Sequence, residues 1–361
     1  MSRAIVSVTN DLNTDQRVAK TCDTLVDLGY EVLLVGRKLK SSTPISRSYK
    51  TKRFNLLFNK SFLFYAEYNF RLFFFLLFSK KKLLISNDLD TLLPNYIISK
   101  LQRKKLVYDS HEIFTEVPEL VDKSFVRRFW TSIEKRIFPK LKNVIVVSPG
   151  VADYYEKAYN VHCHIVRNIP KEISVKPLAL PFDHQGKKTI LYQGSINMGR
   201  GLELMIDAMS LLEDYIFMIA GDGDIIETLK EQVKQKELEN SIIFLGKLGP
   251  AQLKSITPLA DIGISLEEDL GLNYRYALPN KVFDYIHAEI PVVVSDLPEM
   301  KKIVETHQIG RVLKDRRSKE LSSLIKSMDK RQYSNALKKT KKELSWSVEK
   351  EKLIHIFKHL N

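Results

Sequence analysis

The chain has 361 residues, 44% of them hydrophobic, with 14 Gly, 13 Pro and 2 Cys. This length predicts two domains, and the composition excludes collagen-like, disordered and disulfide-framework proteins. The formal net charge is +14, and residues 1–170 supply +12 of it, because they hold 28 Lys and Arg against 16 Asp and Glu.

This uneven charge predicts a negatively charged partner for the first half: an anionic membrane surface, a phosphorylated substrate or nucleic acid. Solvated basic loops are the alternative. Cys22 and Cys163 lack metal-type spacing, and we expect reduced thiols in a cytoplasmic protein. Residues 1–8 lead directly from Arg3 into a strand pattern, so no signal peptide is expected.

The first half repeats a strand and helix unit. Apolar runs predict strands at 4–10, 31–36, 82–88, 105–110, 143–149 and 164–168. The clearest helix pattern spans 14–28, where Val18, Cys22 and Leu25 share a face and Gly29 follows as a stop. Apolar strands alternating with helices predict a parallel sheet covered on both faces.

A proline-containing stretch, 170–187, interrupts the alternation and predicts a linker. Strand patterns then resume at 189–194, 216–221, 241–246, 261–266 and 291–296. The predicted fold is α/β, with two tandem Rossmann-like doubly wound domains at 1–169 and 188–340. Residues 341–361 predict a C-terminal helix, which closes the chain or packs back on the first domain.

The segment 54–82 is rich in Phe, but its longest uncharged apolar run, 72–78, has only 7 residues. A membrane-spanning helix needs about 20. Two interpretations stay open: a buried helix pair of the first domain, or an amphipathic surface that enters lipid beside Lys80–Lys82.

Loops at the carboxyl ends of parallel strands are where such sheets bind ligands. The segment YQGSINMGRGLELMIDAM (192–209) places three glycines and Arg200 between a strand and a helix N-terminus, which suits a diphosphate. A plain tight turn is the alternative. The segment IAGDGD (219–224) has two acidic residues, and we expect a structural turn there.

The stretch YALPNKVFDYIHAEIPVVVSD (276–296) places Lys281 and Asp284 on a helix that follows Pro279. A lysine opposes the helix dipole there, a small cost that is reasonable if the lysine meets a phosphate. Asp284 can accept hydrogen bonds from two vicinal hydroxyls, as in ribose recognition. The alternative is an exposed ion pair between the two residues.

Polar residues also follow two strands of the first domain. Asp109, His111 and Glu112 come after the strand at 105–110. Between the first strand and the first helix lie four more candidates: Asn10, Asn13, Asp15 and Arg17. A structural role is the alternative for each group.

These segments, in this order, resemble the retaining nucleotide-sugar glycosyltransferases of family 4, which have the two-domain glycosyltransferase-B fold. The resemblance rests on NDLNTDQRVAKTCDTLVDLGYEVLLVG, YDSHEIF, VIVVSPGV, VRNIP, YQGSINMGRGLELMIDA and ALPNKVFDYIHAEIPVVVSDLPEMKKIV. The last is similar to a subgroup with the pattern PNK-x-F-[ED]-Y. The resemblance implies that the second domain holds the nucleotide-sugar, that the first holds the acceptor, and that the sugar lies in a cleft between them.

By position, the resemblance places Arg200 on the diphosphate, Asp284 on the ribose hydroxyls, His111 at the transferred sugar and Lys247 near the nucleobase. It departs at Tyr276, where the family has the first Glu of its E-x7-E motif; Glu268 or Asn273 are candidate substitutes. A second basic residue of the family falls on Ser195, and Lys281 is the candidate replacement. Glu289 stands at a usual Gly. The expected donor-binding residues are Gly194, Ser195, Gly199, Arg200, Lys247, Asn280, Lys281 and Asp284.

The resemblance implies a retaining, metal-independent transferase with no cofactor, in which His111, Arg200 and Lys281 are catalytic. The expected acceptor side consists of Asn13, Asp15, Arg17, Asp109 and Glu112. The expected partners are a nucleotide-diphosphate sugar donor, a saccharide or lipid-diphosphate-linked acceptor of surface polysaccharide or glycan synthesis, and an anionic membrane surface. The protein is expected in the cytoplasm or peripherally on the inner face of the membrane.

Two alternatives remain: a nucleotide-sugar epimerase or hydrolase, and a non-catalytic donor-binding partner of another transferase. Nucleic acid is not an expected partner, because the basic excess is not accompanied by a recognition motif.

Overall fold

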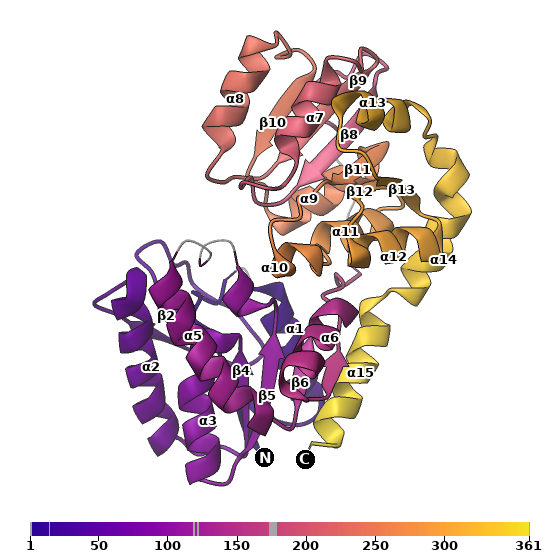
Figure 1. Cartoon of the computed structure of the whole chain (residues 1–361). Helices are drawn as coiled ribbons and strands as arrows, with labels where there is room; N and C mark the ends of the chain where they lie inside the picture. The colour runs from indigo at the N-terminus through magenta and orange to yellow at the C-terminus, as the bar shows by residue number, and fades with distance from the viewer. Residues whose placement is uncertain (1, 14, 118–119, 121–122, 173–178, 361) are drawn as a thin grey trace. The chain divides into compact units, whose positions relative to one another are not determined.

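The structure, a computed structural model, describes residues 2–13, 15–117, 120, 123–172 and 179–360. The chain divides into two compact units (Figure 1). Unit 1 contains residues 1–168 and 349–361, and unit 2 contains residues 169–348. Part of the expected linker, residues 173–178, lies outside the described residues.

Unit 1 is built on a parallel sheet, which in the described residues has seven strands in the order β3-β2-β1-β4-β5-β6-β7. Its strands are β1 Arg3–Ser7, β2 Glu31–Lys38, β3 Lys50–Asn55, β4 Leu83–Asn87, β5 Lys105–Ser110, β6 Val144–Val146 and β7 Cys163–Ile165. Its helices are α1 Gln16–Asp27, α2 Ser61–Phe78, α3 Leu92–Leu101, α5 Ser124–Ile137, α6 Pro149–Tyr159 and most of α15 Trp346–Lys358.

Unit 2 repeats this architecture with six parallel strands in the described residues, in the order β10-β9-β8-β11-β12-β13. The strands are β8 Lys188–Gln193, β9 Tyr215–Ala220, β10 Ile242–Gly246, β11 Ile262–Ser265, β12 Val292–Ser295 and β13 Gly310–Leu313. The α-helices are α7 Leu202–Met209, α8 Ile226–Gln235, α9 Pro250–Ile256, α10 Leu272–Arg275, α11 Asn280–His287, α12 Pro298–His307, α13 Ser318–Lys326 and α14 Ser334–Glu343.

Central strands form where the sequence is apolar throughout, because both faces of each sheet are covered by helices. All residues of β9 are buried, as are those of β4 and β12. Helix α1 begins at Asp15, whose side chain accepts a hydrogen bond from the backbone N–H of Val18, and it buries Val18, Cys22 and Leu25. The predicted fold class is confirmed.

Each sheet has one point at which its strand order reverses. In unit 1 this switch lies between β1 and β4, and in unit 2 it lies between β8 and β11. At such a point the loops leave two neighbouring strands in opposite directions and open a crevice, which is where open α/β sheets bind their ligands.

Two features differ from expectation. Strands β3 and β13 were not predicted, because both are edge strands without an apolar run, and β3 buries only Phe54. The helix pair predicted within 54–82 is wrong, since the segment forms the end of β3 and a single helix, α2. The segment 341–361, expected as a C-terminal helix that closes the chain or packs back on the first domain, contains the end of α14 and the whole of α15, and residues 349–361 group with unit 1.

Candidate active site

The glycine-containing loop after β8 lies at the switch point of unit 2 and packs closely against its surroundings. A Cβ atom on Gly201, where φ is +72°, would lie 2.2 Å from the carbonyl oxygen of Leu266. The adjoining loop at 219–224 supports it, because the backbone of Ile196 exchanges hydrogen bonds with Asp222 and Ile225. This second loop has the structural role expected of it.

Two cations of the predicted donor site meet at one carboxylate, that of Glu267. The Nζ of Lys281 lies 2.6 Å from Oε1 of Glu267, and Nη1 of Arg200 lies 3.7 Å from the same oxygen. The other oxygen of Glu267 accepts a hydrogen bond of 2.7 Å from the Ser265 hydroxyl. Glu267 is completely buried and Lys281 nearly so. The cluster therefore carries two positive charges and one negative charge.

The surroundings keep Glu267 ionised. Burial alone raises the pKa of a carboxyl group, but here the charge of Lys281, the hydrogen bonds from Lys281 and Ser265, and the charge of Arg200 outweigh it. The pKa of Glu267 is therefore below its ordinary value. A buried anion of this kind fixes both cations in place without a ligand.

Lys281 and Arg200 are also held by aromatic rings. The Nζ of Lys281 lies 4.4 Å from the ring centroid of Tyr192, and the guanidinium of Arg200 lies 5.1 Å from that of Tyr274. A Cβ built on Gly194 would lie 3.9 Å from the Nζ of Lys281. Lys281 thus reaches the loop Gly194–Ser195, where the sequence lacks the basic residue of the resembled family.

The Nε of Arg200 is a buried donor with no hydrogen-bond partner among the residues that the structure describes. A buried N–H without an acceptor costs free energy, on the order of 1–3 kcal/mol. Such a group is expected to meet a ligand, and an anion is the partner that a guanidinium prefers.

Asp284 is held at the end of β8. Its Oδ2 accepts a hydrogen bond of 2.8 Å from Nε2 of Gln193, whose Oε1 accepts one from the hydroxyl of Thr257. The expected alternative, an exposed ion pair of Lys281 with Asp284, is not what Lys281 forms, since its partner is Glu267.

The remaining predicted donor residues occupy different places. Ser195 is exposed, and its carbonyl oxygen accepts a 2.6 Å hydrogen bond from the Tyr192 hydroxyl. Asn280 is exposed at the start of α11, and Gly199 is buried in the loop after β8. Lys247 is exposed after the edge strand β10, two strands from β8, so the structure does not gather it with the other cations.

Glu267 was missed, although the sequence ISLEED contains a usable signal. Alternate residues of an extended chain point to the same side, so Ser265 and Glu267 share one direction and Glu268 takes the other. Glu268 is 41% exposed and its carboxylate lies 3.5 Å from Arg316. The substitute suggested at Glu268 therefore lies outside the cluster, and Glu267 lies within it.

In unit 1, a buried ion pair joins the first turn of α1 to the end of β5. The guanidinium of Arg17 donates to Asp109, with 2.6 Å between Nη2 and Oδ1, and to the carbonyl oxygen of Val166. Burial raises the pKa of Asp109, but the charge of Arg17 and the contacts with His111 outweigh it and hold that pKa below its ordinary value. Both side chains of the pair are buried.

His111 lies between two carboxylates at the carboxyl ends of β4 and β5. Its Nδ1 is 3.3 Å from Oδ2 of Asp88, its Nε2 is 3.8 Å from Oδ2 of Asp109, and its backbone N–H donates to Asp88. Burial lowers the pKa of His111, but the two aspartates outweigh this and raise it to about 9. The ring is therefore protonated at neutral pH. Its buried Nε2 has no hydrogen-bond partner in the described part of the chain.

Two further aspartates of this edge were not predicted. Asp88 precedes the turn after β4, and burial raises its pKa above the ordinary value. Asp90 accepts a 2.6 Å hydrogen bond from the hydroxyl of Thr9, which follows β1. Burial, with a smaller effect of Asp88, raises the pKa of Asp90 to about 7. These aspartates line the switch point of unit 1, which only the pairing of β1 with β4 reveals.

The other predicted acceptor residues are engaged locally. Asp15 caps α1 and also accepts a hydrogen bond from the side chain of Asn10, so both of its oxygens have partners. Asn13 bonds to Asp11 through its backbone N–H and its side chain. The carbonyl oxygen of Glu112 accepts from Ser110 and from Tyr155. No group of three or more His, Cys, Asp or Glu side chains that could hold a metal ion occurs among the described residues.

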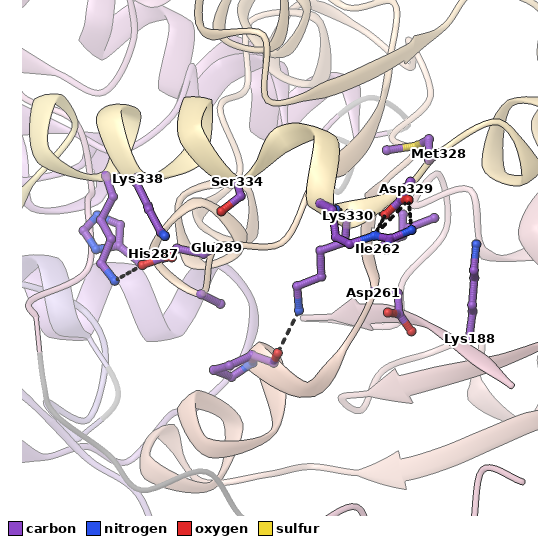
Figure 2. A pocket seen from close by; sticks show the side chains of 14 residues that line it. Lys188, Asp261, Ile262, His287, Glu289, Met328, Asp329, Lys330, Ser334 and Lys338 are labelled. Carbon is purple, nitrogen blue, oxygen red and sulfur yellow. Dashed lines mark hydrogen bonds and ion pairs between the residues drawn. The ribbon is translucent and has the colours of Figure 1, made fainter. Parts of the chain in front are cut away.

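A separate hollow of about 810 Å³ lies at the opposite, amino end of the sheet of unit 2 (Figure 2). Its lining includes Lys188 at the start of β8 and Asp261 just before β11, and none of the predicted donor residues. Three of its cations are already occupied: Lys330 donates to two backbone carbonyls, Arg331 pairs with Asp329, and Lys341 pairs with Glu289. The hollow is therefore not the predicted donor site.

Comparison with known proteins finds a family match within each unit. Residues 15–171 match the family described as Glycosyltransferase Family 4, and residues 181–344 match the family described as glycosyl transferases group 1. An alpha-monoglucosyldiacylglycerol synthase of Streptococcus pneumoniae is 27% identical over 131 residues. This alignment covers 35% of the chain and 28% of that protein, so the chain matches less than a third of this curated relative.

Solved structures share the whole fold. Sucrose-phosphate synthase from Thermosynechococcus elongatus superimposes with a TM-score of 0.84 at 14% identity, over 99% of this chain and 98% of that chain. HepE of Anabaena, in complex with UDP and glucose, superimposes with a TM-score of 0.73 at 15% identity, and 100% of each chain is covered. At such identities the likeness concerns the two-domain fold.

Proposed function

We propose, from the premise that the chain is a glycosyltransferase built from these two family domains, that it transfers a sugar from a nucleoside diphosphate sugar to an acceptor hydroxyl. The observation that carries the proposal is the cluster of Arg200, Lys281 and Glu267 at the switch point of unit 2. Family resemblance supplies the reaction, and the geometry of the cluster supports the diphosphate as its ligand.

The diphosphate of the donor would bind beside Gly194, where Lys281 and the unpartnered Nε of Arg200 can donate to its oxygens. The N-termini of α7 and α11 add partial positive charge. When the bond from the sugar to the phosphate breaks, negative charge grows on the leaving phosphate. Cations already held by Glu267 stabilise that charge without having to reorganise.

The proposed reaction retains the configuration at the anomeric carbon, as the family resemblance implies. The acceptor oxygen forms its bond to the anomeric carbon on the face from which the phosphate leaves, and the acceptor proton passes to a phosphate oxygen. Arg200 and Lys281 would supply the positive charge that a divalent metal supplies in other transferases, so we propose a metal-independent enzyme.

The remaining predicted roles are part of the same proposal. Asp284 would accept hydrogen bonds from the ribose hydroxyls, and Lys247 would lie near the base. In unit 1, protonated His111 would donate through Nε2 to the transferred sugar, with Asp88 as its orienting partner. We assign Arg17 and Asp109 a positioning role beneath His111. The proposed acceptor is a saccharide carried on a lipid diphosphate.

The test measures nucleotide binding and transfer separately. Thermal shifts with UDP, GDP, TDP and CDP are expected to identify one class of base, and Arg200→Met is expected to weaken binding of that nucleotide on the order of tenfold or more. The matched control is Lys230→Met, which removes a charge from an exposed ion pair on α8 and should leave binding unchanged. Binding by none of the four nucleotides would contradict the donor assignment.

Transfer itself is followed by release of the nucleoside diphosphate with and without a lipid-linked saccharide. Release that needs the acceptor and persists in EDTA supports the transferase. Release without an acceptor would instead indicate a hydrolase or epimerase, and nucleotide binding without any turnover would indicate a donor-binding partner of another enzyme.

A further inference from the structure

Helix α2 has an apolar face on each of its two sides. Phe64, Tyr68, Leu72 and Leu76 are buried against the sheet of unit 1, with Ile5, Val35 and Leu84 among their neighbours. Residues two positions away lie about 200° around a helix, on the opposite side. That side holds Phe62, Phe70, Phe74 and Phe78, of which Phe70 is 65% exposed and Phe78 is 82% exposed. A surface helix of a water-soluble domain normally presents polar residues there.

Helix α5 extends this surface. The rings of Phe62 and Phe129 are 5.6 Å apart and meet edge to face, and Phe125 on α5 is 74% exposed. Helices α2, α3 and α5 lie together over one side of unit 1 (Figure 1). We define the phenylalanine face as Phe62, Phe70, Phe74 and Phe78 of α2 with Phe125 and Phe129 of α5. Several large exposed aromatic side chains gathered on one side mark an interaction surface.

The charge along α2 and α3, on one side of the phenylalanine face, is strongly positive. Residues 57–82 contain five Lys or Arg and one acid, Glu67, which is paired with Arg71. Lys60, Lys80 and Lys82 are exposed at the two ends of α2, whereas Lys81 is buried and donates to carbonyl oxygens. Residues 92–105 of α3 and its flank contain four Lys or Arg and no acid. An aromatic centre with a cationic border is complementary to anionic lipid headgroups above an acyl layer.

Other occupants fit less well. A second copy of the chain would bring one cationic border against another, which the charges oppose. Helix α2 is the one described helix long and apolar enough to span a membrane by length and composition, but its inner face forms part of the core of unit 1. A spanning position would expose the sheet that Tyr68 and Leu72 cover, so a helix lying in the membrane surface is the arrangement that keeps the fold.

We propose that the phenylalanine face binds the surface of an anionic lipid bilayer, with the rings of α2 at the level of the headgroups and the lysines on either side among the phosphates. This surface belongs to unit 1 and stands independently of the donor chemistry of unit 2. If the proposed function holds as well, the same contact brings the enzyme to a lipid-linked acceptor.

The test is sedimentation of the purified chain with unilamellar vesicles, either phosphatidylcholine alone or phosphatidylcholine and phosphatidylglycerol in equal amounts. Binding is expected with the anionic vesicles, weaker with the neutral ones and weaker again in high salt, where charges are screened. Phe70→Ser/Phe78→Ser is expected to lower the partition coefficient on the order of tenfold, because two exposed aromatic anchors are lost.

The matched control is Leu211→Ser/Val348→Ser, which removes two exposed apolar side chains from unit 2 and is expected to leave partitioning unchanged. An unaltered unfolding temperature of both variants shows that they fold. The proposal is overturned if the wild-type chain does not bind anionic vesicles, if both double variants bind equally well, or if the chain is a dimer that Phe70→Ser/Phe78→Ser dissociates. Nucleotide binding, measured on the same samples, reports on the proposed function separately.

Discussion

At the scale of single residues, the centre of unit 2 is a carboxylate that holds two cations. Glu267 is fully buried. The family resemblance does not mark this position; it expects a Glu at position 276, where the chain has Tyr276. A buried carboxylate between Lys281 and Arg200 lowers the net charge of the cluster but fixes the direction of both donors. Preorganised donors are what a diphosphate leaving group requires.

A double-mutant cycle on Lys281 and Glu267 separates the effect of this ion pair on stability from its effect on nucleotide binding. Lys281→Met leaves Glu267 buried with only the more distant Arg200, and we expect a loss of about 3 kcal/mol in the free energy of unfolding. Lys281→Met/Glu267→Gln removes both charges and should recover most of that loss. Both variants should bind the nucleoside diphosphate at least about tenfold more weakly than wild type, because each lacks Lys281.

The measurements are urea unfolding and nucleotide titration of the four proteins. The control pair, Lys230→Met and Glu227→Gln on α8, is exposed, so its cycle should give a coupling of less than about 1 kcal/mol. If the double variant binds nucleotide as tightly as wild type, Lys281 is not part of the donor site.

His111 makes stability depend on pH in the alkaline range. Its pKa rises from the ordinary value of 6.5 to about 9 in the folded chain, so the folded state binds the proton more tightly than the unfolded state. The contribution of protonated His111 to the free energy of unfolding is fully present below the unfolded pKa of 6.5. It is lost as the pH rises through about 9. At about 1.36 kcal/mol per pH unit it amounts to about 3 kcal/mol as an upper bound.

We therefore expect wild type to lose stability between about pH 7 and about pH 10 more steeply than His111→Gln, as measured by urea unfolding at each pH. Asp90, whose pKa is about 7, loses its proton at the start of this range, so it adds little to the change of stability at higher pH. Equal slopes for the two proteins would show that the aspartates do not hold a proton on His111.

At the scale of elements, the loop after β8 packs against the loop after β11, and this close approach requires a glycine. Gly201 has φ of +72° and its missing Cβ would collide with the backbone of Leu266, which follows β11. The approach of the β8 and β11 loops is what places Arg200 beside Glu267. The position of Arg200 at the switch point thus depends on close backbone packing as well as on charged side chains.

Gly201→Ala tests this dependence against a matched control. Gly29→Ala introduces the same left-handed strain at φ of +82° but meets no atom within 4 Å, and we expect it to cost about 1–2 kcal/mol in the free energy of unfolding. Gly201→Ala adds displacement of the Leu266 backbone and should cost more by about 1–3 kcal/mol. It should also weaken nucleotide binding, which Gly29→Ala should leave intact.

At the scale of the whole molecule, the last residues of the chain complete the first unit. The backbone N–H of Arg167 donates to the Glu349 carboxylate at 2.8 Å, Lys350 lies 2.8 Å from Asp27, and Leu353 is buried. Unit 1 is therefore discontinuous in sequence, and unit 2 is inserted between its two parts.

A chain that ends at Val348 is expected to lose several kcal/mol of stability in unit 1, because Leu353, Ile356 and Phe357 no longer cover it. Its two tryptophans report on the units separately, since Trp130 lies in unit 1 and Trp346 in unit 2. In the Trp346→Phe background, fluorescence reports on unit 1, and the truncated chain should unfold at a lower midpoint than the full-length chain. In the Trp130→Phe background, fluorescence reports on unit 2, and the midpoint should be unchanged. Nucleotide affinity should be unchanged, and an equal loss in both transitions would contradict the division.

The sequence by itself determined the alternation of strands and helices, the two-sheet fold and the glycine loop with Arg200, because these depend on the period and composition of neighbouring residues. It did not determine edge strands such as β3, which have no apolar run of their own and exist only through pairing with β2. It also left the face of α2 undecided, because both sides of that helix are apolar and only packing shows which one meets the sheet.

The tertiary structure alone decided the two clusters of charge. Glu267 and Lys281 are 14 residues apart, Arg17 and Asp109 are 92 apart, and Thr9 and Asp90 are 81 apart. No local period encodes such contacts, since they arise from the order in which strands pair and from the reversal of that order at β1/β4 and β8/β11. The sequence supplied charged side chains at the ends of strands, and the pairing of the strands decided which of them meet.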